Sequence, residues 1–318
     1  ATTFLAKENA STVLILGNGS LSPYYISAYA SMVGIKKIYL GCRNQQKANE
    51  AKKKLVEETG KDLFEILLLD VSESYSVQQA VTRLKSPVDA VILNAGGTGG
   101  KTPHQLTEDG VTTIFASNVL GHVVLVEELV KKQLVTSTII YAGSETARGV
   151  PRMGVAKPEL KDASVQEFSS IADGSKFGSN ADPLDVYGTI KLTGTLWMSS
   201  MARQHPHLRF VTISPGGTTG TNGMDDLPLL KKVFFKYVGG TVMPLFGMMH
   251  SVEKGAKRYL EGLFNPSFES GRFYASRAGS PTGPVIDQVT LEPLFNNSSA
   301  QDNAYQAIQQ FLTAKTPA

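Results

Sequence analysis

Short β-branched runs alternate with longer segments of helical period along most of the chain, a pattern typical of a parallel sheet covered by helices on both faces. We predict strands at 12–17, 36–42, 63–69, 88–93, 136–142, 208–214 and 271–275. Helices are expected between them, at 23–34, 45–59, 74–85, 107–131 with a break, 185–204, 251–264 and 300–313. Every crossover is long enough for a right-handed βαβ unit, so the sequence predicts an α/β fold with one doubly wound sheet, as a single domain over 1–318.

Two segments interrupt this alternation. Residues 145–182 are rich in Gly, Ser, Asp and Pro, and residues 215–250 hold apolar patches broken by Pro and Gly. We interpret them as a long insertion and a lid region at the carboxyl edge of the sheet, where ligands bind in this architecture, with bland linkers as the alternative. The apolar stretch 233–249 suggests a pocket lid, a surface between copies or peripheral membrane contact, while Lys236 and Pro244 argue against a spanning helix.

Charge and cysteine content exclude several classes of protein. The 31 Lys and Arg balance 28 Asp and Glu, and no basic run exceeds 52–54, so a nucleic-acid partner is not supported. A single cysteine, Cys42, excludes an internal disulfide and fits a reducing compartment.

No metal is predicted, because the five histidines show no metal-ligand spacing. The first 17 residues lack an export signal, so we expect the cytoplasm, or an organelle stroma if a transit peptide has been removed.

The stretch LILGNGSLSPYY, residues 14–25, leads from the first strand into the first helix. Aligned on G-x-G-x-x-G it matches at Gly17 and Gly19, with the small Ser22 at the third position. Pro23 suits a first helical turn, and the free N–H groups there make an anion site. A glycine turn that binds nothing is the alternative for this loop taken alone. The predicted cofactor contacts here are Gly17, Asn18, Gly19, Ser20 and Leu21.

A second glycine-rich stretch, AGGTGGKT at residues 95–102, fits a permissive phosphate-loop pattern. A true phosphate loop needs a helix that starts at its Lys-Thr pair, whereas Pro103 and a polar stretch follow here and the first glycine is Ala95. We therefore expect Asn94, Ala95 and Gly96 to end the fourth strand, and ATP binding is disfavoured.

Tyr187 and Lys191 lie in DVYGTIKLTGTLW, a helical stretch in which positions i and i+4 share a face. A nearby ammonium would lower the pKa of the phenol from about 10 toward neutrality and let the tyrosine exchange a proton with a carbonyl oxygen. Alone, this spacing is also explained by an exposed helix pair.

Over nearly its whole length the chain resembles the short-chain dehydrogenases/reductases. The matching motifs occur in the family's order: the Gly17 loop, Asp70-Val71, Asn94-Ala95-Gly96, Asn118, Ser144, Tyr187-x-x-x-Lys191 and Ser214-Pro215-Gly216. The resemblance implies a Rossmann-type fold with Tyr187 as general acid and with Lys191 on the nicotinamide ribose. It also implies that Ser144 orients the substrate carbonyl and that Asn118 supports a proton-relay water. In the family's G-x-x-x-G-x-G loop, Leu21 and Pro23 replace two glycines.

The same resemblance places the remaining cofactor contacts at Asp70, Val71, Asn94, Ala95, Gly96, Lys191, Pro215, Gly216 and Thr218. Where NAD-binding relatives carry an acid after the second strand, this chain has Cys42, followed by Arg43 and Lys47. Cations there favour a 2′-phosphate, so the cofactor is predicted to be NADP(H), with ordinary surface cations as the alternative.

Within the family, the chain is most similar to the light-dependent protochlorophyllide reductases. The shared stretches include GCRNQQKA at 41–48, residues 107–132 and the long interval from Ser144 to Tyr187, whereas Gly217 replaces that group's cysteine. The predicted function is NADPH-dependent hydride transfer to a bulky hydrophobic carbonyl or conjugated double bond. Two alternatives stay open: a catalytically altered member that acts in binding or assembly, and a protochlorophyllide reductase. A homo-oligomer is also open.

Overall fold

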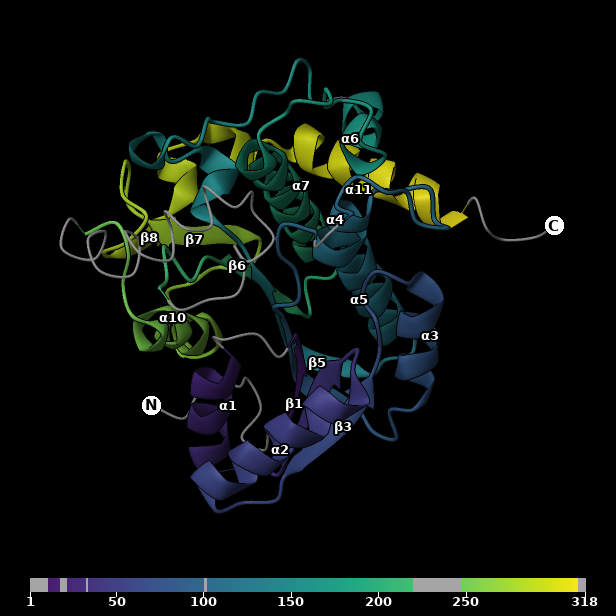
Figure 1. Ribbon diagram of the computed structural model, residues 1–318, viewed down its shortest axis with the longest axis vertical. Coiled ribbons are helices and arrows are strands. Elements are labelled where there is room, and N and C mark those ends of the chain that lie inside the picture. Colours follow the sequence, from purple (N-terminus) through teal and green to yellow (C-terminus); the bar gives the residue numbers. More distant parts are fainter. Residues whose placement is uncertain (1–10, 18–21, 33, 100–101, 220–246, 314–318) are drawn as a thin grey trace.

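The computed structural model describes residues 11–17, 22–32, 34–99, 102–219 and 247–313 (Figure 1). The predictions for Asn18, Gly19, Ser20 and Leu21, and for most of the 215–250 lid, lie outside these residues.

Eight strands form one sheet in the order β3-β2-β1-β4-β5-β6-β7-β8. They are β1 Thr12–Leu16, β2 Lys37–Cys42, β3 Phe64–Leu68, β4 Val88–Leu93, β5 Val135–Ala142, β6 Arg209–Ile213, β7 Arg272–Ser276 and β8 Val285–Asp287. All neighbours pair in parallel except β7 and β8. The predicted doubly wound, Rossmann-type sheet is confirmed, and its strand order reverses between β1 and β4, where such sheets bind ligands.

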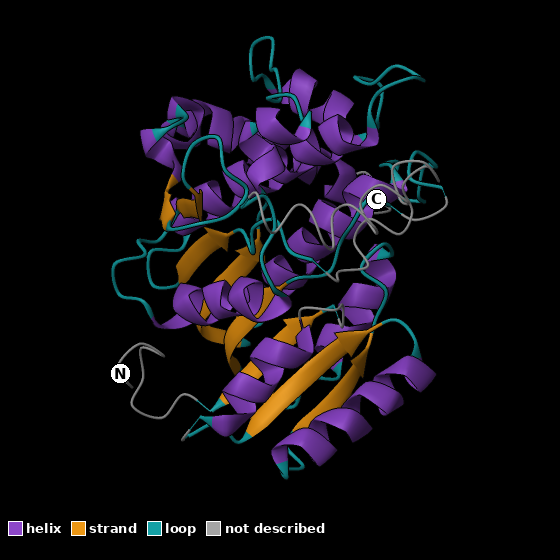
Figure 2. Cartoon of the chain, turned by 60° about the vertical axis from the view of Figure 1, so that its left-hand side comes forward, coloured by secondary structure: helices purple, strands orange, loops and turns teal. Residues whose placement is uncertain are grey.

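Helices cover both faces of this sheet (Figure 2). Their bounds are α1 Ser22–Ser31, α2 Gln45–Thr59, α3 Ser74–Thr82, α4 Thr113–Phe115, α5 Gly121–Lys131, α6 Val165–Ala172, α7 Pro183–Gln204, α10 Val252–Phe264 and α11 Ser298–Thr313. Side chains of α1, α2 and α10 form one apolar cluster with the sheet, and those of α3, α5, α7 and α11 form another. These two clusters make the core, because both faces of each central strand are buried.

The helix expected over 107–131 differs from its prediction. Residues 107–112 are not helical, and α4 and α5 are joined by a π-helical turn, Ala116–Leu120. Among the described residues, the combined helix Thr113–Lys131 is long and apolar enough to cross a membrane, but most of its apolar window is buried inside the protein, as in a core helix. No helix begins at Thr102, which agrees with the prediction against a phosphate loop at 95–102.

The segment 145–182 follows β5 at the carboxyl edge of the sheet. It contains two short 3-10 turns, Glu145–Arg148 and Pro151–Met153, and the helix α6, which packs on α11. The sequence did not predict α6, because only eight residues are helical within a polar segment. Ser164 caps it by accepting a hydrogen bond from the Glu167 N–H at 3.2 Å.

Candidate active site

The long helix α7 carries Tyr187 and Lys191. Its start is fixed by Asp182, which accepts from the Leu184 N–H at 2.9 Å, and by Pro183 in the first turn. Two glycines let the helix lie close to its neighbours: a Cβ at Gly188 would sit 2.6 Å from the Thr146 carbonyl oxygen, and one at Gly194 2.4 Å from the Tyr141 hydroxyl. This close packing sets Tyr187 and Lys191 beside the carboxyl end of β5.

Lys191 is buried, with only 2% of its surface exposed. Its Nζ donates to the Ala142 carbonyl oxygen at 3.0 Å and lies 4.8 Å from the centre of the Tyr141 ring and 5.5 Å from that of Tyr187. It forms no ion pair with any acidic residue that the structure describes. Burial lowers the pKa of Lys191 to about 7. The alternative of an exposed helix pair is therefore wrong.

Tyr187 departs from the electrostatic prediction. Its pKa is raised above the ordinary value, because burial disfavours the phenolate and the Glu145 carboxylate adds repulsion, while a hydrogen bond with Ser144 acts in the opposite direction. The sequence predicted that Lys191 would lower the pKa of Tyr187 toward neutrality, and for the protein without cofactor this is wrong. Lys191 is itself only partly charged near neutral pH, so it gives the phenolate little stabilisation.

Ser144 follows β5 and caps the turn Glu145–Arg148. Its Oγ accepts from the Thr146 N–H at 3.2 Å and from the Thr146 hydroxyl at 2.8 Å. Since Thr146 occupies the acceptor side of this oxygen, the Ser144 proton is available for donation toward Tyr187 or toward a carbonyl oxygen bound beside it.

Asn118 lies in the π-helical turn and is fully buried. Its amide donates to the carbonyl oxygens of Gly97 and Ile114, both at 2.8 Å, and its Oδ1 accepts from the Gly97 N–H at 3.1 Å. Its own carbonyl oxygen accepts from the Tyr141 hydroxyl at 2.9 Å. The side chain thus holds the backbone after β4, and the role of supporting a relay water stays a prediction.

Two glycines, Gly17 and Gly96, lie where β1 and β4 end, and we call this pair the cradle. Gly17 has φ +86°, and a Cβ on it would lie 2.7 Å from the backbone of Ala95. Gly96 has φ +143°, and a Cβ there would lie 2.4 Å from the Asn118 Oδ1 and 3.6 Å from the Lys191 Nζ. Neither position has room for a side chain, because Ala95 and Asn118 already occupy that space, so the glycines let the ends of β1 and β4 approach each other and Asn118 closely.

The beginning of α1 closes this cradle with hydroxyl groups in place of glycines. Ser22 is buried and donates to the Gly17 carbonyl oxygen at 2.7 Å, and its Oγ lies 3.0 Å from the Tyr25 hydroxyl. The Asn94 amide donates to the same Oγ at 3.4 Å. Pro23 is the second residue of α1, so the helix begins one residue earlier than predicted and still has its proline in the first turn.

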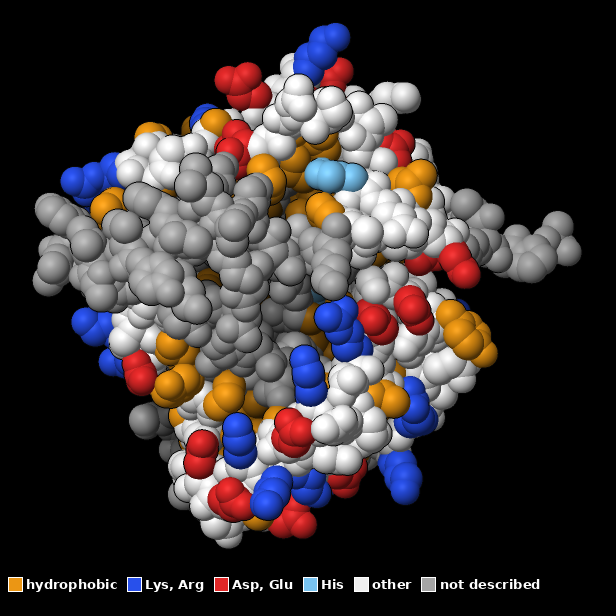
Figure 3. All heavy atoms as spheres, viewed as in Figure 1, with side chains coloured by type: hydrophobic (Ala, Val, Ile, Leu, Met, Phe, Trp, Pro, Cys, Tyr) orange, Lys and Arg blue, Asp and Glu red, His pale blue; other side chains and the backbone are white. Residues whose placement is uncertain are grey.

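The opposite end of the predicted cofactor site lies beyond β2 and β3. Arg43 and Lys47 are exposed at the start of α2, and neither pairs with a described acid. Figure 3 shows basic and acidic side chains interspersed over the lower part of the face, where Figure 1 places α2.

Asp70 accepts from the N–H and hydroxyl of Ser72, at 2.9 and 2.7 Å. The Val71 carbonyl lies so close to α5 that a Cβ on Gly121 would be 1.8 Å from its oxygen.

The loop after β6 carries Pro215, Gly216 and Thr218. The His250 Nε2 donates to the Pro215 carbonyl oxygen at 2.7 Å, and the Gly217 N–H donates to the Pro281 carbonyl oxygen at 2.6 Å. Gly216 has φ +80°, and a Cβ there would meet the Arg258 Nη1 at 2.7 Å. The loop is thus held in place at the carboxyl edge, next to β5.

Sequence reasoning missed four buried polar residues around this site: His122, Tyr141, Glu145 and Arg258. The His122 Nε2 donates to the Ala95 carbonyl oxygen at 2.8 Å, and burial together with Lys191 lowers the pKa of His122 to about 3, so it is neutral. Only Glu145 left a signal, since it directly follows Ser144. His122 and Tyr141 occur in apolar segments, where a polar group is not expected to act, and Arg258 occurs among the charged residues of α10, where it resembles a surface side chain.

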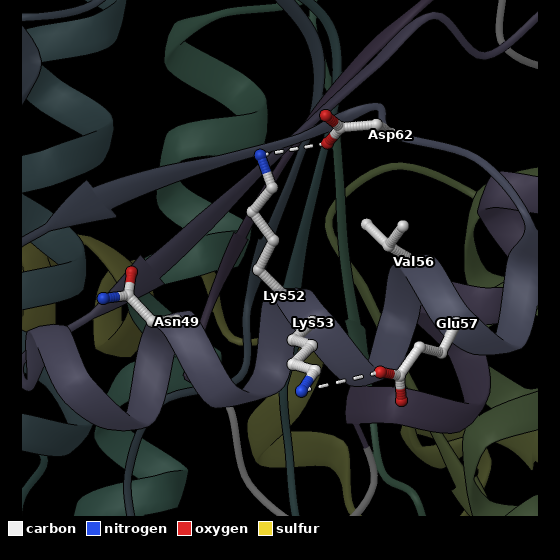
Figure 4. A pocket seen from close by; sticks show the side chains of 6 residues that line it. All are labelled: Asn49, Lys52, Lys53, Val56, Glu57 and Asp62. Atoms are coloured by element: carbon white, nitrogen blue, oxygen red, sulfur yellow. Dashed lines mark ion pairs between the residues drawn. The ribbon is translucent and has the colours of Figure 1, made fainter.

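A surface hollow of about 450 Å³ lies along α2, away from these groups. Figure 4 shows the ion pairs within it, Lys52 with Asp62 at 3.0 Å and Lys53 with Glu57 at 3.9 Å. It holds none of the site residues. Among the described residues, no group of three or more His, Cys, Asp or Glu side chains could hold a metal ion.

Comparison with known proteins agrees with this architecture. Residues 13–156 match the short chain dehydrogenase family. The chain is 28% identical over 190 residues to the WW domain-containing oxidoreductase of Gallus gallus, covering 58% of this chain and 41% of that protein. It is 27% identical over 280 residues to the short-chain dehydrogenase TIC 32 A, chloroplastic, of Brassica napus, covering 82% and 79%. The chain therefore spans less than half of the chicken relative.

Solved structures share the fold at low identity. An uncharacterized protein from Mycobacterium Paratuberculosis superposes with a TM-score of 0.67 at 18% identity, over 100% of both chains. The NADPH-bound carbonyl reductase from chicken fatty liver gives 0.53 at 17% identity, over 83% of this chain and 96% of that one. The fold is that of an α/β protein with one doubly wound, Rossmann-type sheet. The family match covers residues 13–156, somewhat less than half of the chain, and the chain is similar to the short-chain dehydrogenase of Brassica napus along most of its length.

Proposed function

We propose that the protein is an NADPH-dependent oxidoreductase that transfers a hydride to a bulky hydrophobic carbonyl or conjugated double bond, with Tyr187 as the general acid. The observation that carries this proposal is the buried Lys191, held by the Ala142 carbonyl oxygen between Tyr187 and the Gly96 backbone. A buried amine without an acidic partner among the described residues is costly to keep charged, and perturbed groups of this kind cluster at functional sites.

The chain's own groups suit carbonyl reduction. Tyr187 is protonated at neutral pH, as a phenol whose pKa is not lowered must be, so it holds a proton that can pass to the substrate oxygen as negative charge develops there. The Ser144 hydroxyl accepts from Thr146 and has one proton to donate, toward Tyr187 or toward the substrate oxygen where negative charge develops. Lys191 would face the cofactor ribose across Gly96, and the bound nicotinamide would supply the hydride.

Gly17 and Gly96 support dinucleotide binding, because they end β1 and β4 without a side chain at the point where the strand order reverses and where this architecture binds its ligand. Arg43 and Lys47 support NADPH over NADH, since both are exposed at the start of α2 without a described partner and no acid replaces Cys42. The pKa of Cys42 is raised to about 11 by burial, so it carries no charge there. Pro215, Gly216 and Thr218 would line the nicotinamide end.

A fluorescence titration of the purified protein with NADPH and NADH tests this cofactor choice. We expect NADPH to bind at least about tenfold more tightly, and the double variant Arg43→Ala, Lys47→Ala to lose that preference. The variant Lys52→Ala, Lys53→Ala on the outer face of α2 is the matched control, because it removes the same charge and leaves Arg43 and Lys47 intact. Comparable binding of the two nucleotides by the wild type would refute the choice.

The substrate class rests on the sequence, because the apolar part of the 215–250 lid lies outside the described residues. A screen of bulky carbonyls and tetrapyrroles with NADPH tests it. Reduction of protochlorophyllide is the narrower proposal, and an absorbance assay with pigment, NADPH and light decides it. A location in the cytoplasm or an organelle stroma, and assembly as a homo-oligomer, stay predictions. The Brassica napus relative is named as chloroplastic.

A second candidate function is binding or assembly without turnover. The observation that favours it is the altered loop: Leu21 and Pro23 stand where family members have glycines, and the buried Ser22 hydroxyl between them bonds to the Gly17 carbonyl oxygen. This alternative predicts no saturable NADPH binding, so the same titration separates the two functions.

A further inference from the structure

Tyr141 lies near the end of β5, directly before Ala142, and is fully buried against the Lys191 amine. The centre of its ring is 4.8 Å from the Lys191 Nζ, and the Ala142 carbonyl oxygen accepts from the same Nζ at 3.0 Å. A cation within about 6 Å of the centre of an aromatic ring is attracted to the face of that ring, and more strongly where water is excluded. Two consecutive residues of one strand thus contact the amine, one through its ring and the other through its backbone.

The orientation of the Tyr141 ring is fixed from several sides. Its hydroxyl donates to the Asn118 carbonyl oxygen at 2.9 Å. The rings of His122 and Trp197 meet it edge to face, with centroids 5.9 and 6.3 Å away. Gly194 makes room for the phenol, because a Cβ there would lie 2.4 Å from the hydroxyl oxygen. The ring cannot turn without breaking these contacts, so the same face stays toward the amine.

The titratable groups that face Lys191 come from three elements. Tyr187, one turn earlier on α7, has its ring centre 5.5 Å from the Nζ, and Tyr141 faces it from β5. His122 faces it from α5 and is neutral, because burial together with Lys191 lowers its pKa to about 3. None of the acidic residues in the described part of the chain pairs with this amine. Aromatic rings and a carbonyl oxygen therefore surround it in place of a carboxylate.

The position of the amine matters for the proposed reaction. A lysine side chain is a flexible four-carbon stem, so its end is placed by the groups that it contacts. The Nζ lies beside Tyr187, and a Cβ on Gly96 would be 3.6 Å from it. This is the point from which Lys191 would reach both the phenol and a cofactor ribose.

We infer that Tyr141 is a positioning residue for Lys191: its ring face, together with the neighbouring Ala142 carbonyl oxygen, holds the amine between Tyr187 and the Gly96 backbone. The inference rests on the proposed function for the catalytic meaning of that position. The contact itself exists in the protein without cofactor or substrate, so it can be measured separately.

The experiment follows ionisation of Lys191 by carbon-13 NMR of the cofactor-free protein labelled at lysine Cε, with the signal assigned by its absence in Lys191→Met. In the wild type we expect the midpoint near the Lys191 pKa of about 7. The ring attracts only the protonated amine, so Tyr141→Leu should lower the midpoint by about half to one and a half pH units. Tyr141→Phe keeps the ring and should titrate as the wild type does.

Tyr39→Leu is the matched control. The Lys37 Nζ lies 5.3 Å from the centre of the Tyr39 ring, so the variant removes a contact of the same kind, but on β2, which is separated from β5 by two strands. It should leave the Lys191 signal unchanged. If Tyr141→Leu does not fold, Tyr141→Met fills the space with a more adaptable apolar side chain and should show the same lowered midpoint.

An unchanged or raised midpoint in a folded Tyr141→Leu or Tyr141→Met would overturn the inference, because the ring would then do no more than exclude water. An equal lowering in Tyr141→Phe would also overturn it, since the hydroxyl and not the ring would be responsible.

Single-turnover oxidation of bound NADPH gives the catalytic readout. Tyr141→Leu should react at least about tenfold more slowly than the wild type, because a small displacement of a group beside the reacting atoms is costly, whereas Tyr141→Phe should stay close to the wild-type rate. A wild-type rate in Tyr141→Leu would contradict the catalytic part of the inference. If the wild type does not oxidise NADPH, the proposed function fails while the NMR result still decides the role of Tyr141, so the two failures are distinguishable.

Discussion

Replacing Lys191 with methionine should make the cofactor-free protein more stable, because the structure buries this amine without an acidic partner among the described residues. Burial lowers the pKa of Lys191 from 10.5 to about 7. One unit of pKa difference corresponds to about 1.4 kcal/mol, so the charged form costs the folded state up to roughly 5 kcal/mol. Methionine keeps an apolar stem of similar length and gives up one hydrogen bond, to the Ala142 carbonyl oxygen, worth about 1 kcal/mol.

The effect should depend on pH in a defined direction. Between pH 7 and 10.5 the unfolded chain carries a protonated Lys191 while the folded protein carries a neutral one, so the unfolded state binds more protons and stability rises with pH. Below this window Lys191 is charged in both states and the cost is complete. Lys191→Met should therefore gain about 3–4 kcal/mol at pH 6, and most of that gain should disappear by pH 10.

Urea unfolding of the wild type and Lys191→Met, followed by circular dichroism at several pH values, measures this difference. Lys53→Met is the control, because that side chain is 79% exposed and should give a variant with the wild-type pH dependence. Parallel stability curves for wild type and Lys191→Met from pH 7 to 10, or a loss of stability at pH 6, would refute the claim that Lys191 is held at a cost.

Two further substitutions test the backbone around the site. Gly96→Ala should lower the free energy of unfolding by about 2 kcal/mol and weaken NADPH binding, because φ is +143° and the new Cβ would lie 2.4 Å from the Asn118 Oδ1. Urea unfolding and NADPH titration of this variant measure the two effects. Unchanged NADPH binding would contradict a role of Gly96 in the cofactor site. Tyr141→Phe should cost about 1–3 kcal/mol, because the Asn118 carbonyl oxygen loses the hydroxyl that bonds to it at 2.9 Å, and wild-type stability would show that this contact contributes nothing.

Regular periodicity made most of the fold predictable. The helix predicted at 45–59 has those bounds in α2, because Asn44 caps its start and Gly60, with φ +66°, ends it. The strand β8 and the helix α6 were missed, because three and eight residues are too short to show a period. Both depend on tertiary partners: β8 pairs with β7, and α6 packs on α11.

The sequence predicted the site residues that belong to recognisable motifs, and it did not predict the residues that surround them. The i and i+4 spacing placed Tyr187 and Lys191 on one face of α7, and the order of motifs placed Ser144 beside them. The direction of the Tyr187 pKa could not be derived this way, since it depends on burial and on Glu145, whose partners Ser214, Arg258 and Ser276 are distant in sequence. The pKa of a group in this buried site depends on residues that come together only when the edge of the sheet has folded.

The central claim is that Tyr187 donates the proton in an NADPH-dependent reduction, and single-turnover oxidation of bound NADPH by a bulky carbonyl from the screen tests it most directly. Tyr187→Phe should bind NADPH as the wild type does, because phenylalanine keeps the aromatic ring and removes only the hydroxyl. Its rate of NADPH oxidation should fall by roughly a hundredfold to ten-thousandfold. An unchanged rate in Tyr187→Phe, with wild-type NADPH affinity, would contradict the account.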